Sequence, residues 1–281
     1  MLFKSVRFRT SCFKLDQSAK EAALYFGLVV QFEGGFCRLI VNCWFNFSAI
    51  IMTISIIIPT LNEAENIGVI IKFLQRFKNN GIAEIIIVDG GSKDDTMGIA
   101  SQSGAKVVQS PRKGRAAQMN YGASLAIGDV FYFIHADTFP PETYATDIIK
   151  WVKAGYDIGR YRTQFNSRKQ ILKLNAFFTR FDLFICFGGD QTLYMTRALF
   201  ERLNGYNEDL HIMEEYGLVS RAKKQAKYKI MPGATLISAR KYDGNSWWKV
   251  QRANYAIVQM YKAGVSQEMM VKRYDELIRY R

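Results

Sequence analysis

The sequence predicts an α/β fold, in which a mixed and mostly parallel sheet is flanked by helices in one main domain. Three short runs of β-branched, aliphatic or aromatic residues support this prediction: 54–58, 84–88 and 129–134. Each run ends in polar or acidic residues, and helical segments lie between them, as in parallel strands joined by helices. Because ligands bind beyond the carboxyl ends of such strands, we expect Asp89 and Asp137 to face one crevice.

The first predicted strand is followed by a helix. Pro59 ends the strand, because proline lacks the backbone donor that a central strand needs. Apolar residues then recur at the spacing of one helical face: Ile67, Ile70, Ile71 and Leu74. Glycines and capping residues at 90–96 predict a second helix before a short strand at 106–109. We interpret Asp94 and Asp95 as capping residues of this loop.

A basic cluster precedes the next predicted helix. Arg112, Lys113 and Arg115 surround Gly114 at the point where the helix begins. The positive end of a helix dipole opposes basic side chains unless an anion is present, so the cluster suggests a phosphate contact. A solvated charged loop is the alternative that this spacing leaves open.

The third predicted strand ends in His135-Ala136-Asp137, before a Pro-Pro turn. This position fixes the Asp137 carboxylate on rigid backbone. A nucleotide-bound Mg²⁺ or Mn²⁺ commonly takes one or two protein carboxylates, and phosphate oxygens and water complete its shell. Asp137 can therefore suffice as the metal ligand. His135 is a candidate second ligand, and a packed or hydrogen-bonded histidine is the alternative.

The composition points to an anionic partner. The 281-residue chain has a formal net charge of +13, which suits a nucleotide diphosphate or an anionic lipid surface. No zinc finger, RNP-like motif or Lys/Arg tract accompanies this charge, so nucleic acid is not the expected partner. The four cysteines lack CxxC spacing, which argues against a zinc site and a disulfide framework. We expect a cytoplasmic protein that can also lie at the inner face of the membrane.

Residues 1–51 differ from the rest of the chain, since they lack its alternation of strands and helices. They contain three of the four cysteines. We interpret Met52 as the biological start and the preceding residues as an upstream read-through. A membrane-contacting extension is the alternative. The apolar window 39–58 is long enough for a membrane helix, but it includes the first strand of the sheet.

Four motifs follow one another in the order found in a known family: PTLNE (59–63), VDGGSKDDT (88–96), KGRAAQMNYGA (113–123) and FIHADT (133–138). Together they resemble the nucleotide-sugar half of the family 2 glycosyltransferases, which have the GT-A fold. More narrowly, they resemble the bacterial radical-SAM/selenodomain-associated transferases. The resemblance extends from about Thr53 to Tyr274. His135 stands where a DxD motif has its first aspartate, a variant that this subgroup shares.

The resemblance implies a nucleotide-diphosphate sugar as co-substrate, with Mg²⁺ or Mn²⁺. The implied donor-binding residues are Pro59, Thr60, Asn62, Glu63, Asp89, Gly90, Gly91, Arg115, Gln118, Asn120, Asp190, Gln191 and Arg240. In the family, the aspartate matching Asp89 contacts the nucleobase or ribose, and the aspartate matching Asp137 holds the metal. Arg240 would belong to a loop that closes over the diphosphate. Asp190 and Gln191 would line the junction of donor and acceptor.

The GT-A domain is expected over 52–242, with a nucleotide-sugar half (52–140) and an acceptor half (141–242). We interpret the aromatic segment that starts at Phe177 as core or as an apolar acceptor groove. Residues 243–281 are expected to form a helical segment that packs on the domain or lies on a membrane surface. The acceptor is not identified, and a lipid or other apolar molecule is one candidate.

Glu214 and Glu215 open a predicted helix, where two acids also complement the helix dipole without a catalytic role. The family has a Glu-Asp pair here, and its second acid is the catalytic base. Glu215 takes the aspartate position with one more methylene, so either glutamate can be the residue that reaches the acceptor. The resemblance thus implies an inverting glycosyltransferase. The alternatives are a metal-dependent nucleotidyltransferase and a nucleotide-sugar-binding protein without catalysis.

Overall fold

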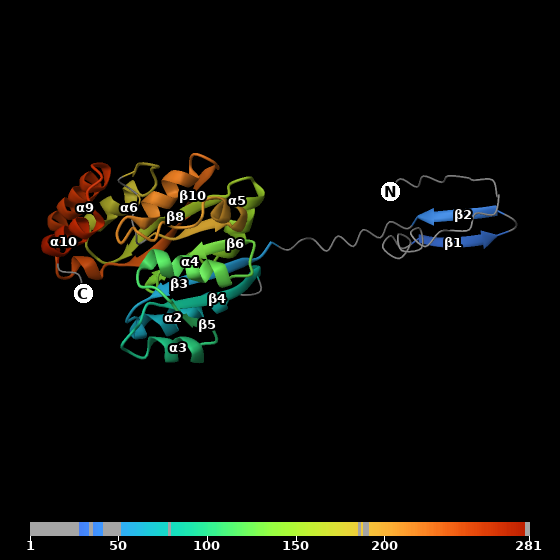
Figure 1. Cartoon of the computed structure of the whole chain (residues 1–281), viewed down its shortest axis with the longest axis horizontal. Helices are drawn as coiled ribbons and strands as arrows, with labels where there is room; N and C mark the ends of the chain where they lie inside the picture. Colours follow the sequence, from blue (N-terminus) through green and yellow to red (C-terminus); the bar gives the residue numbers. More distant parts are fainter. Residues whose placement is uncertain are drawn as a thin grey trace. The chain divides into compact units, whose positions relative to one another are not determined.

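The computed structural model describes residues 28–33, 36–41, 52–77, 80–184, 187 and 191–278. The chain divides into two compact units, residues 1–51 and residues 52–281. In the first unit, β1 (Leu28–Glu33) pairs antiparallel with β2 (Phe36–Val41). The predicted site residues all belong to the second unit, which Figure 1 colours from light blue to red.

An eight-stranded sheet forms the centre of the second unit. Its strands are β3 (Ile54–Thr60), β4 (Ile82–Asp89), β5 (Lys106–Gln109), β6 (Val130–Phe133), β7 (Thr138–Phe139), β8 (Ile158–Asn166), β9 (Leu193–Thr196) and β10 (Tyr228–Ser238). Their order across the sheet is β5-β4-β3-β6-β9-β8-β10-β7. The pairs among β3 to β6 are parallel, whereas β9 is antiparallel to β6 and β8. The predicted mixed, mostly parallel sheet is confirmed.

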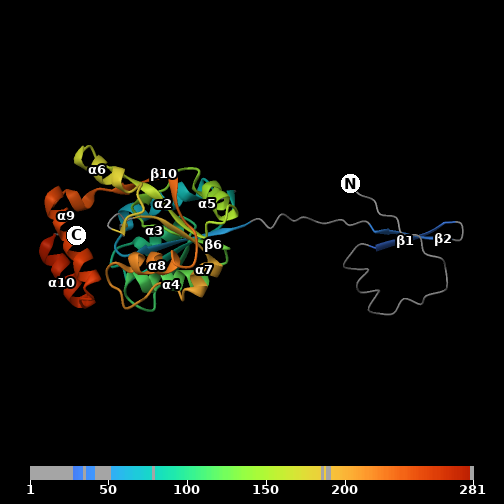
Figure 2. The ribbon, with the colours of Figure 1, turned by 90° about the horizontal axis from the view of Figure 1, so that it is seen from above.

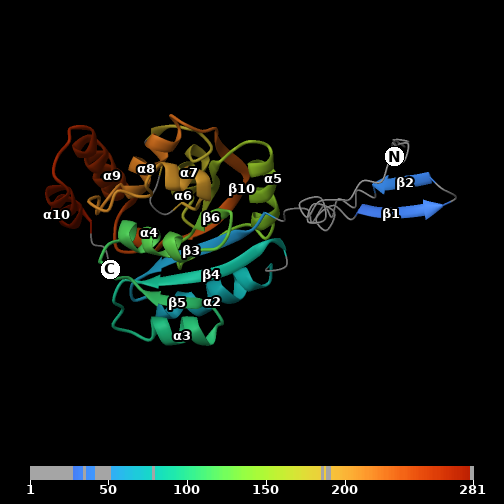
Figure 3. The same cartoon turned by 45° about the vertical axis from the view of Figure 1, so that its right-hand side comes forward.

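Helices cover both faces of this sheet. They are α2 (Ala64–Gln75), α3 (Thr96–Gln102), α4 (Arg115–Leu125), α5 (Tyr144–Lys153), α6 (Ile171–Phe178), α7 (Arg197–Arg202), α8 (Glu214–Ala222), α9 (Trp247–Lys262), α10 (Gln267–Leu277) and the 3-10 helix η3 (Arg240–Tyr242). In Figure 3, α2 and α3 lie below β3 and β4, and α4 lies above them.

The alternation of side chains along β3 explains why two cores form. Ile56 and Ile58 pack with α2, α3 and α5, while Ile57 points the other way and packs with α4, α7 and α8. All three side chains are completely buried. Because both faces of the strand are covered, its sequence is a continuous apolar run rather than an alternating one.

Two sequence predictions need correction. The sequence predicts two final strands, at 229–231 and 234–238, but the structure has one strand there, β10. Its register shifts between Met231 and Ala234 because Pro232-Gly233 interrupts the ladder. The interpretation of the aromatic segment as core holds for its later part, because Phe187, Tyr194, Phe200 and Tyr206 are buried. Its first part is not core, since the large side chains at 177, 178, 181 and 183 are 41–53% exposed.

The C-terminal helices are present as predicted. Ser246 and Ser266 cap them, since each side chain accepts a hydrogen bond from a backbone N–H in the first turn. Val250 and Ile257 of α9 are buried in the domain. Among the described residues, no helix has both the length and the apolarity needed to cross a bilayer.

Candidate active site

The candidate site lies where β3, β4 and β6 end. These strands pair parallel in the order β4-β3-β6, so their carboxyl ends meet at one edge of the sheet. Pro59 and Thr60 are the last two residues of β3, and Asp89 is the last residue of β4. All three are buried. The loops that follow these strands are therefore neighbours, and ligands of parallel sheets bind at such an edge.

Asp89 organises the loop that follows β4. Its carboxylate accepts hydrogen bonds from the backbone N–H of Gly91 and of Ser92, both at 2.8 Å, and from the Ser92 hydroxyl. Gly91 has φ +99°, a conformation that favours glycine. Asp89 is completely buried. Its carboxylate therefore fixes the loop after β4, rather than facing an open crevice as the sequence predicts.

Asn62 and Gln118 hold the neighbouring loops together. The Asn62 backbone N–H donates to the Ser92 hydroxyl at 2.9 Å, and its side-chain oxygen accepts from the Lys93 N–H at 2.8 Å.

The Gln118 amide donates to the carbonyls of Thr60 and Val88, at 2.9 and 2.7 Å. A Cβ added at Gly90 would lie 3.0 Å from this amide. These predicted donor-binding residues thus make bonds within the protein.

Asp94 caps two helices at once. Its carboxylate accepts hydrogen bonds from the backbone N–H of Ala64, at the start of α2, and of Thr96, at the start of α3, both at 3.1 Å. The hydrogen bond from the Thr96 hydroxyl is the main cause that lowers the pKa of Asp94, and the two backbone donors add to it. The carboxylate therefore fixes the loops on both sides of the site.

Arg240 joins two acidic side chains from different strand ends. Its guanidinium contacts the Asp137 carboxylate at 2.9 Å and the Glu63 carboxylate at 3.2 Å. Glu63 follows β3, Asp137 follows β6 and Arg240 begins η3 after β10, so three separate loops meet here. Burial acts to lower the pKa of Arg240, but the hydrogen bond to Asp137 and the charge of Glu63 raise it overall. We call these three residues the strand-end ion cluster.

The side chains at the strand ends fit a metal ion that is bound by a diphosphate at the same time. Asp137 is the most exposed carboxylate of the strand-end ion cluster, with 27% of its side chain accessible. His135 lies in the same loop and is partly buried. No group of three or more His, Cys, Asp or Glu side chains among the described residues could hold a metal ion. A divalent ion here would need oxygen ligands from a nucleotide, which is the usual arrangement for Mg²⁺.

Glu214 and Glu215 begin α8 and face Arg115, the first residue of α4. The Arg115 guanidinium lies 3.3 Å from the Glu214 carboxylate and 3.6 Å from the Glu215 carboxylate. The exposed fractions of the two acidic side chains are 3% and 11%. Met213, just before them, has φ +67°, a left-handed conformation that is uncommon for a residue with a side chain. Backbone strain therefore lies directly before the acid pair.

Tyr206 lies beside the acid pair and was not predicted from the sequence. Burial raises the pKa of its hydroxyl well above the ordinary value, and the charges of Glu215 and Glu214 raise it further. Asn120 fixes the turn that contains Tyr206, because its side chain exchanges two hydrogen bonds with the Tyr206 backbone at 2.8 and 2.9 Å. The pattern Gly205-Tyr206 predicts a turn but gives no sign that the tyrosine meets the acids.

Of the two residues predicted to line the junction of donor and acceptor, only one is described. Asp190 lies outside the described residues, and Gln191 is partly buried immediately before β9. The structure thus brings the other predicted residues into two groups. One is the strand-end ion cluster, and the other is the acid pair with Arg115. Asn62, Asp89, Gln118 and Asn120 fix loops of the site by hydrogen bonds.

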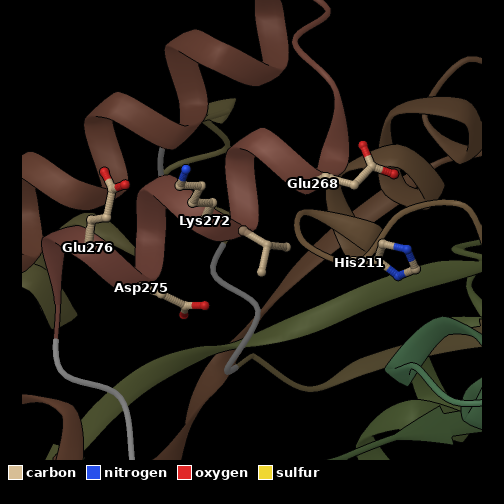
Figure 4. A pocket seen from close by; sticks show the side chains of 6 residues that line it. His211, Glu268, Lys272, Asp275 and Glu276 are labelled. Atoms are coloured by element: carbon tan, nitrogen blue, oxygen red, sulfur yellow. The ribbon is translucent and has the colours of Figure 1, made fainter.

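A hollow of about 740 Å³ lies beside the loop that leads to α8. Its lining includes His211 and, from α10, Glu268, Lys272, Asp275 and Glu276 (Figure 4). The Gln267 side chain accepts hydrogen bonds from the backbone N–H of His211 and Ile212, at 3.0 and 3.1 Å. Helix α10 therefore fixes the loop that precedes the acid pair. The lining contains none of the predicted site residues.

A mixed sheet of this order, with acidic loops at its strand ends and an acid pair opening α8, defines a protein of the GT-A fold class. Residues 55–203 match the family model described as Glycosyl transferase family 2. The chain belongs to this family. The narrower resemblance to the radical-SAM/selenodomain-associated subgroup stays a prediction.

Several known proteins are similar to this chain. Glucosyl-3-phosphoglycerate synthase of Mycolicibacterium smegmatis is 29% identical over 98 residues, or 32% of each chain. The chain spans about a third of the length of the curated relatives it matches. The mannosyltransferase from Pyrobaculum calidifontis in complex with GDP-Man and Mn²⁺ has a TM-score of 0.59 at 21% identity, covering 75% of this chain and 64% of that one.

A second solved structure is the glucosyl-3-phosphoglycerate synthase from Mycobacterium tuberculosis, in complex with Mn²⁺, uridine-diphosphate and glucosyl-3-phosphoglycerate. Its TM-score is 0.55 at 20% identity, and the match covers 76% of this chain and 81% of that one. At this level of identity the likeness shows the shared fold.

Proposed function

We propose that this protein is a metal-dependent, inverting glycosyltransferase, which transfers a sugar from a nucleotide-diphosphate sugar to an acceptor hydroxyl. The observation that carries the proposal is the buried pair Glu214 and Glu215 against Arg115. Burying two adjacent carboxylates is costly unless a cation and hydrogen bonds compensate. We therefore propose that this pair supplies the group that accepts the proton of the acceptor hydroxyl.

The strand-end ion cluster is proposed to receive the diphosphate of the donor. Asp137, with His135, would hold the metal, which when bound neutralises charge on the leaving diphosphate. A guanidinium has five N–H donors, so Arg240 can contact a phosphate oxygen while it keeps a bond to Glu63. The two similar solved structures contain Mn²⁺ with a nucleotide or nucleotide sugar, which supports this assignment.

Glu215 is proposed to act as the general base. It takes the proton from the acceptor hydroxyl as that oxygen attacks the anomeric carbon. The bond from this carbon to the diphosphate oxygen breaks at the same time, so the configuration at the carbon inverts. Glu214 is closer to Arg115 and less exposed, which makes it the better ion-pair partner of the two. Glu215 is therefore the better candidate for the base.

A binding protein without catalysis is the second candidate. It is favoured by one observation, since the ion pairs of Arg115 with both acids also explain their burial as structural. A nucleotidyltransferase is less well supported, because PTLNE (59–63) is not the Gly-rich phosphate loop that such enzymes have after their first strand.

The test is release of nucleotide diphosphate from a panel of nucleotide sugars with Mn²⁺. If the protein is a transferase, the release of nucleotide diphosphate should depend on the metal and should rise with a suitable acceptor. NMR of the product would then show whether the anomeric configuration is inverted. Calorimetric binding of a nucleotide sugar without any release, across the acceptor panel, would favour the binding protein instead.

A further inference from the structure

Helix α6 presents its more apolar side to solvent. The side that contacts the domain includes Leu172, Asn175 and Thr179, spaced three and four residues apart. Leu172 is buried in a core cluster, the Asn175 side chain accepts from the Trp247 indole N–H at 3.0 Å, and the Thr179 hydroxyl accepts from the Thr163 N–H at 2.9 Å. Two of these three inward residues are polar, which reverses the usual pattern of a surface helix.

The outward side of α6 and the turn after it is formed by large apolar residues. These exposed side chains are Ile171, Leu174, Phe177, Phe178, Phe181 and Leu183. Phe177, Phe178 and Phe181 contact one another, with ring centroids 5.7 to 6.3 Å apart. Contiguous apolar surface of this kind marks an interaction site. We call these six residues the α6 face.

Helix α9 adds exposed aromatic and basic side chains beside the α6 face. Trp248 is 71% exposed and its ring packs edge-on against Trp247, which is hydrogen-bonded to α6. Arg252 and Tyr255 follow Trp248 at i+4 and i+7, so they lie on the same side of α9 and are also exposed. Figure 2 shows α6 standing out from the edge of the domain next to α9.

The charge around this surface is positive. Residues 168–183 contain four basic residues and one acidic residue, and α9 contains three basic residues and none that is acidic. The acidic Asp182 is paired with Lys223 at 2.6 Å, and among the four basic residues Lys169 is paired with Asp243 at 3.5 Å. Lys173 is exposed on α6, and the Arg180 guanidinium lies 4.0 Å from the centroid of the Phe177 ring. Aromatic side chains with basic residues at their margin match an anionic lipid surface.

We propose that the α6 face, together with Trp248, Arg252 and Tyr255, docks the protein on an anionic membrane surface. The apolar side chains would enter the boundary between head groups and acyl chains, and the basic side chains would contact lipid phosphates. This docking is separate from the proposed sugar transfer and does not depend on it.

The inward side of α6, opposite the α6 face, is linked to the helix that carries Arg240 of the strand-end ion cluster. The Asn175 amide donates to the Tyr242 hydroxyl at 3.0 Å, and Lys169 donates to the Tyr242 carbonyl. Tyr242 ends η3, the short helix that Arg240 begins. Docking by α6 would therefore bring the candidate donor site close to the lipid surface, where a membrane-borne acceptor would be found.

The test is flotation of the full chain with phosphatidylcholine vesicles that contain or lack phosphatidylglycerol. We expect binding to anionic vesicles that weakens as salt is added. Leu174→Ser with Phe178→Ser should lower the partition coefficient at least tenfold, because two apolar side chains no longer enter the lipid. The matched control is Val69→Ser with Ile127→Ser, which removes two exposed apolar side chains elsewhere and should leave binding unchanged.

A second pair of variants tests the charges. Arg168→Gln with Lys173→Gln should weaken binding to anionic vesicles about fivefold per charge, with little effect on neutral vesicles. Lys72→Gln with Lys153→Gln changes two exposed lysines outside the docking surface and serves as the control. All these side chains are exposed, so every variant is expected to fold. Thermal melting checks this expectation.

The position of Trp248 gives an independent readout. Anionic vesicles should shift the tryptophan emission to the blue, and Trp248→Phe should remove most of the shift. No binding of the full chain to anionic vesicles, or equal binding by the face variants and their controls, would overturn the proposal. A dimer that forms as the concentration rises would also overturn the proposal, if Leu174→Ser with Phe178→Ser dissociated it without any effect on lipid binding. The α6 face would then join two copies of the chain.

Discussion

At the scale of single residues, Arg115 decides how the acid pair can act. It lies within 3.6 Å of both Glu214 and Glu215, so one guanidinium is the ion-pair partner of both carboxylates. Glu214 is the nearer and less exposed of the two, which leaves Glu215 as the acid that is proposed to meet the acceptor.

We therefore predict that Glu215→Gln lowers the rate of sugar transfer by about a hundredfold to ten-thousandfold, the usual contribution of a general base. Glutamine keeps the shape and hydrogen bonding of glutamate but accepts no proton. Affinity for the nucleotide sugar should change little, because most of the proposed donor-binding residues lie in the loops after the earlier strands. Glu214→Gln should cost less activity. Transfer rates and donor affinities of the two variants provide the comparison, and equal, small losses would contradict the assignment of a base.

A second residue-scale prediction concerns Asp137. Asp137→Asn removes the charge at nearly constant volume, so we expect metal-dependent turnover to be abolished while the protein stays folded. Arg240 keeps its contact with Glu63 at 3.2 Å, which limits the structural effect. Mn²⁺ titration and release of nucleotide diphosphate measure the loss, with Asp209→Asn as an exposed control. Near-normal turnover of Asp137→Asn in Mn²⁺ would place the metal elsewhere.

At the scale of elements, Asp94 shows how one carboxylate can stabilise two helices. It accepts hydrogen bonds from the first turns of α2 and α3, where backbone N–H groups have no partner within the helix. Asp94→Asn should lower the melting temperature, because the amide is a weaker acceptor for these donors. Asp95→Asn, the next and also exposed residue, is the matched control and should have a smaller effect.

The same contact predicts a pH dependence. The pKa of Asp94 is lowered in the folded state, so its stabilising effect is fully present above the unfolded value of 3.8 and is lost as the pH falls through the folded value. The difference in melting temperature between the native protein and Asp94→Asn should therefore shrink as the pH is taken below about 4. A difference that stays constant from pH 7 to pH 3 would show that the cap does not act through the charged carboxylate.

Elements were easier to predict from the sequence than contacts between them. The helix at α2 was predicted with its four buried residues, because periodicity shows which side chains share one face. Periodicity does not show which face meets the core, so the sequence gives no sign that Phe177 and Phe178 are exposed. The pairing of Arg115 with the acid pair was also invisible, since it joins the starts of two helices about a hundred residues apart and depends on tertiary packing.

At the scale of the whole molecule, the second unit has the features of a domain that folds by itself. Its two main cores enclose the sheet from both faces, and every residue in them lies at or beyond position 54. The predicted site residues belong to the same unit, as do the helices α9 and α10 that pack on it.

We therefore predict that a chain that begins at Met52 folds and binds the nucleotide sugar as tightly as the full chain does. Removing residues 1–51 takes away no core residue of the second unit, so the melting temperature should change little. Calorimetric binding of the donor and thermal melting of the two chains provide the comparison. Vesicle flotation of the shorter chain adds a separate test, because docking through the α6 face should persist without the first unit. If the shorter chain were insoluble, or lost donor binding that the full chain keeps, residues 1–51 would be part of the functional domain.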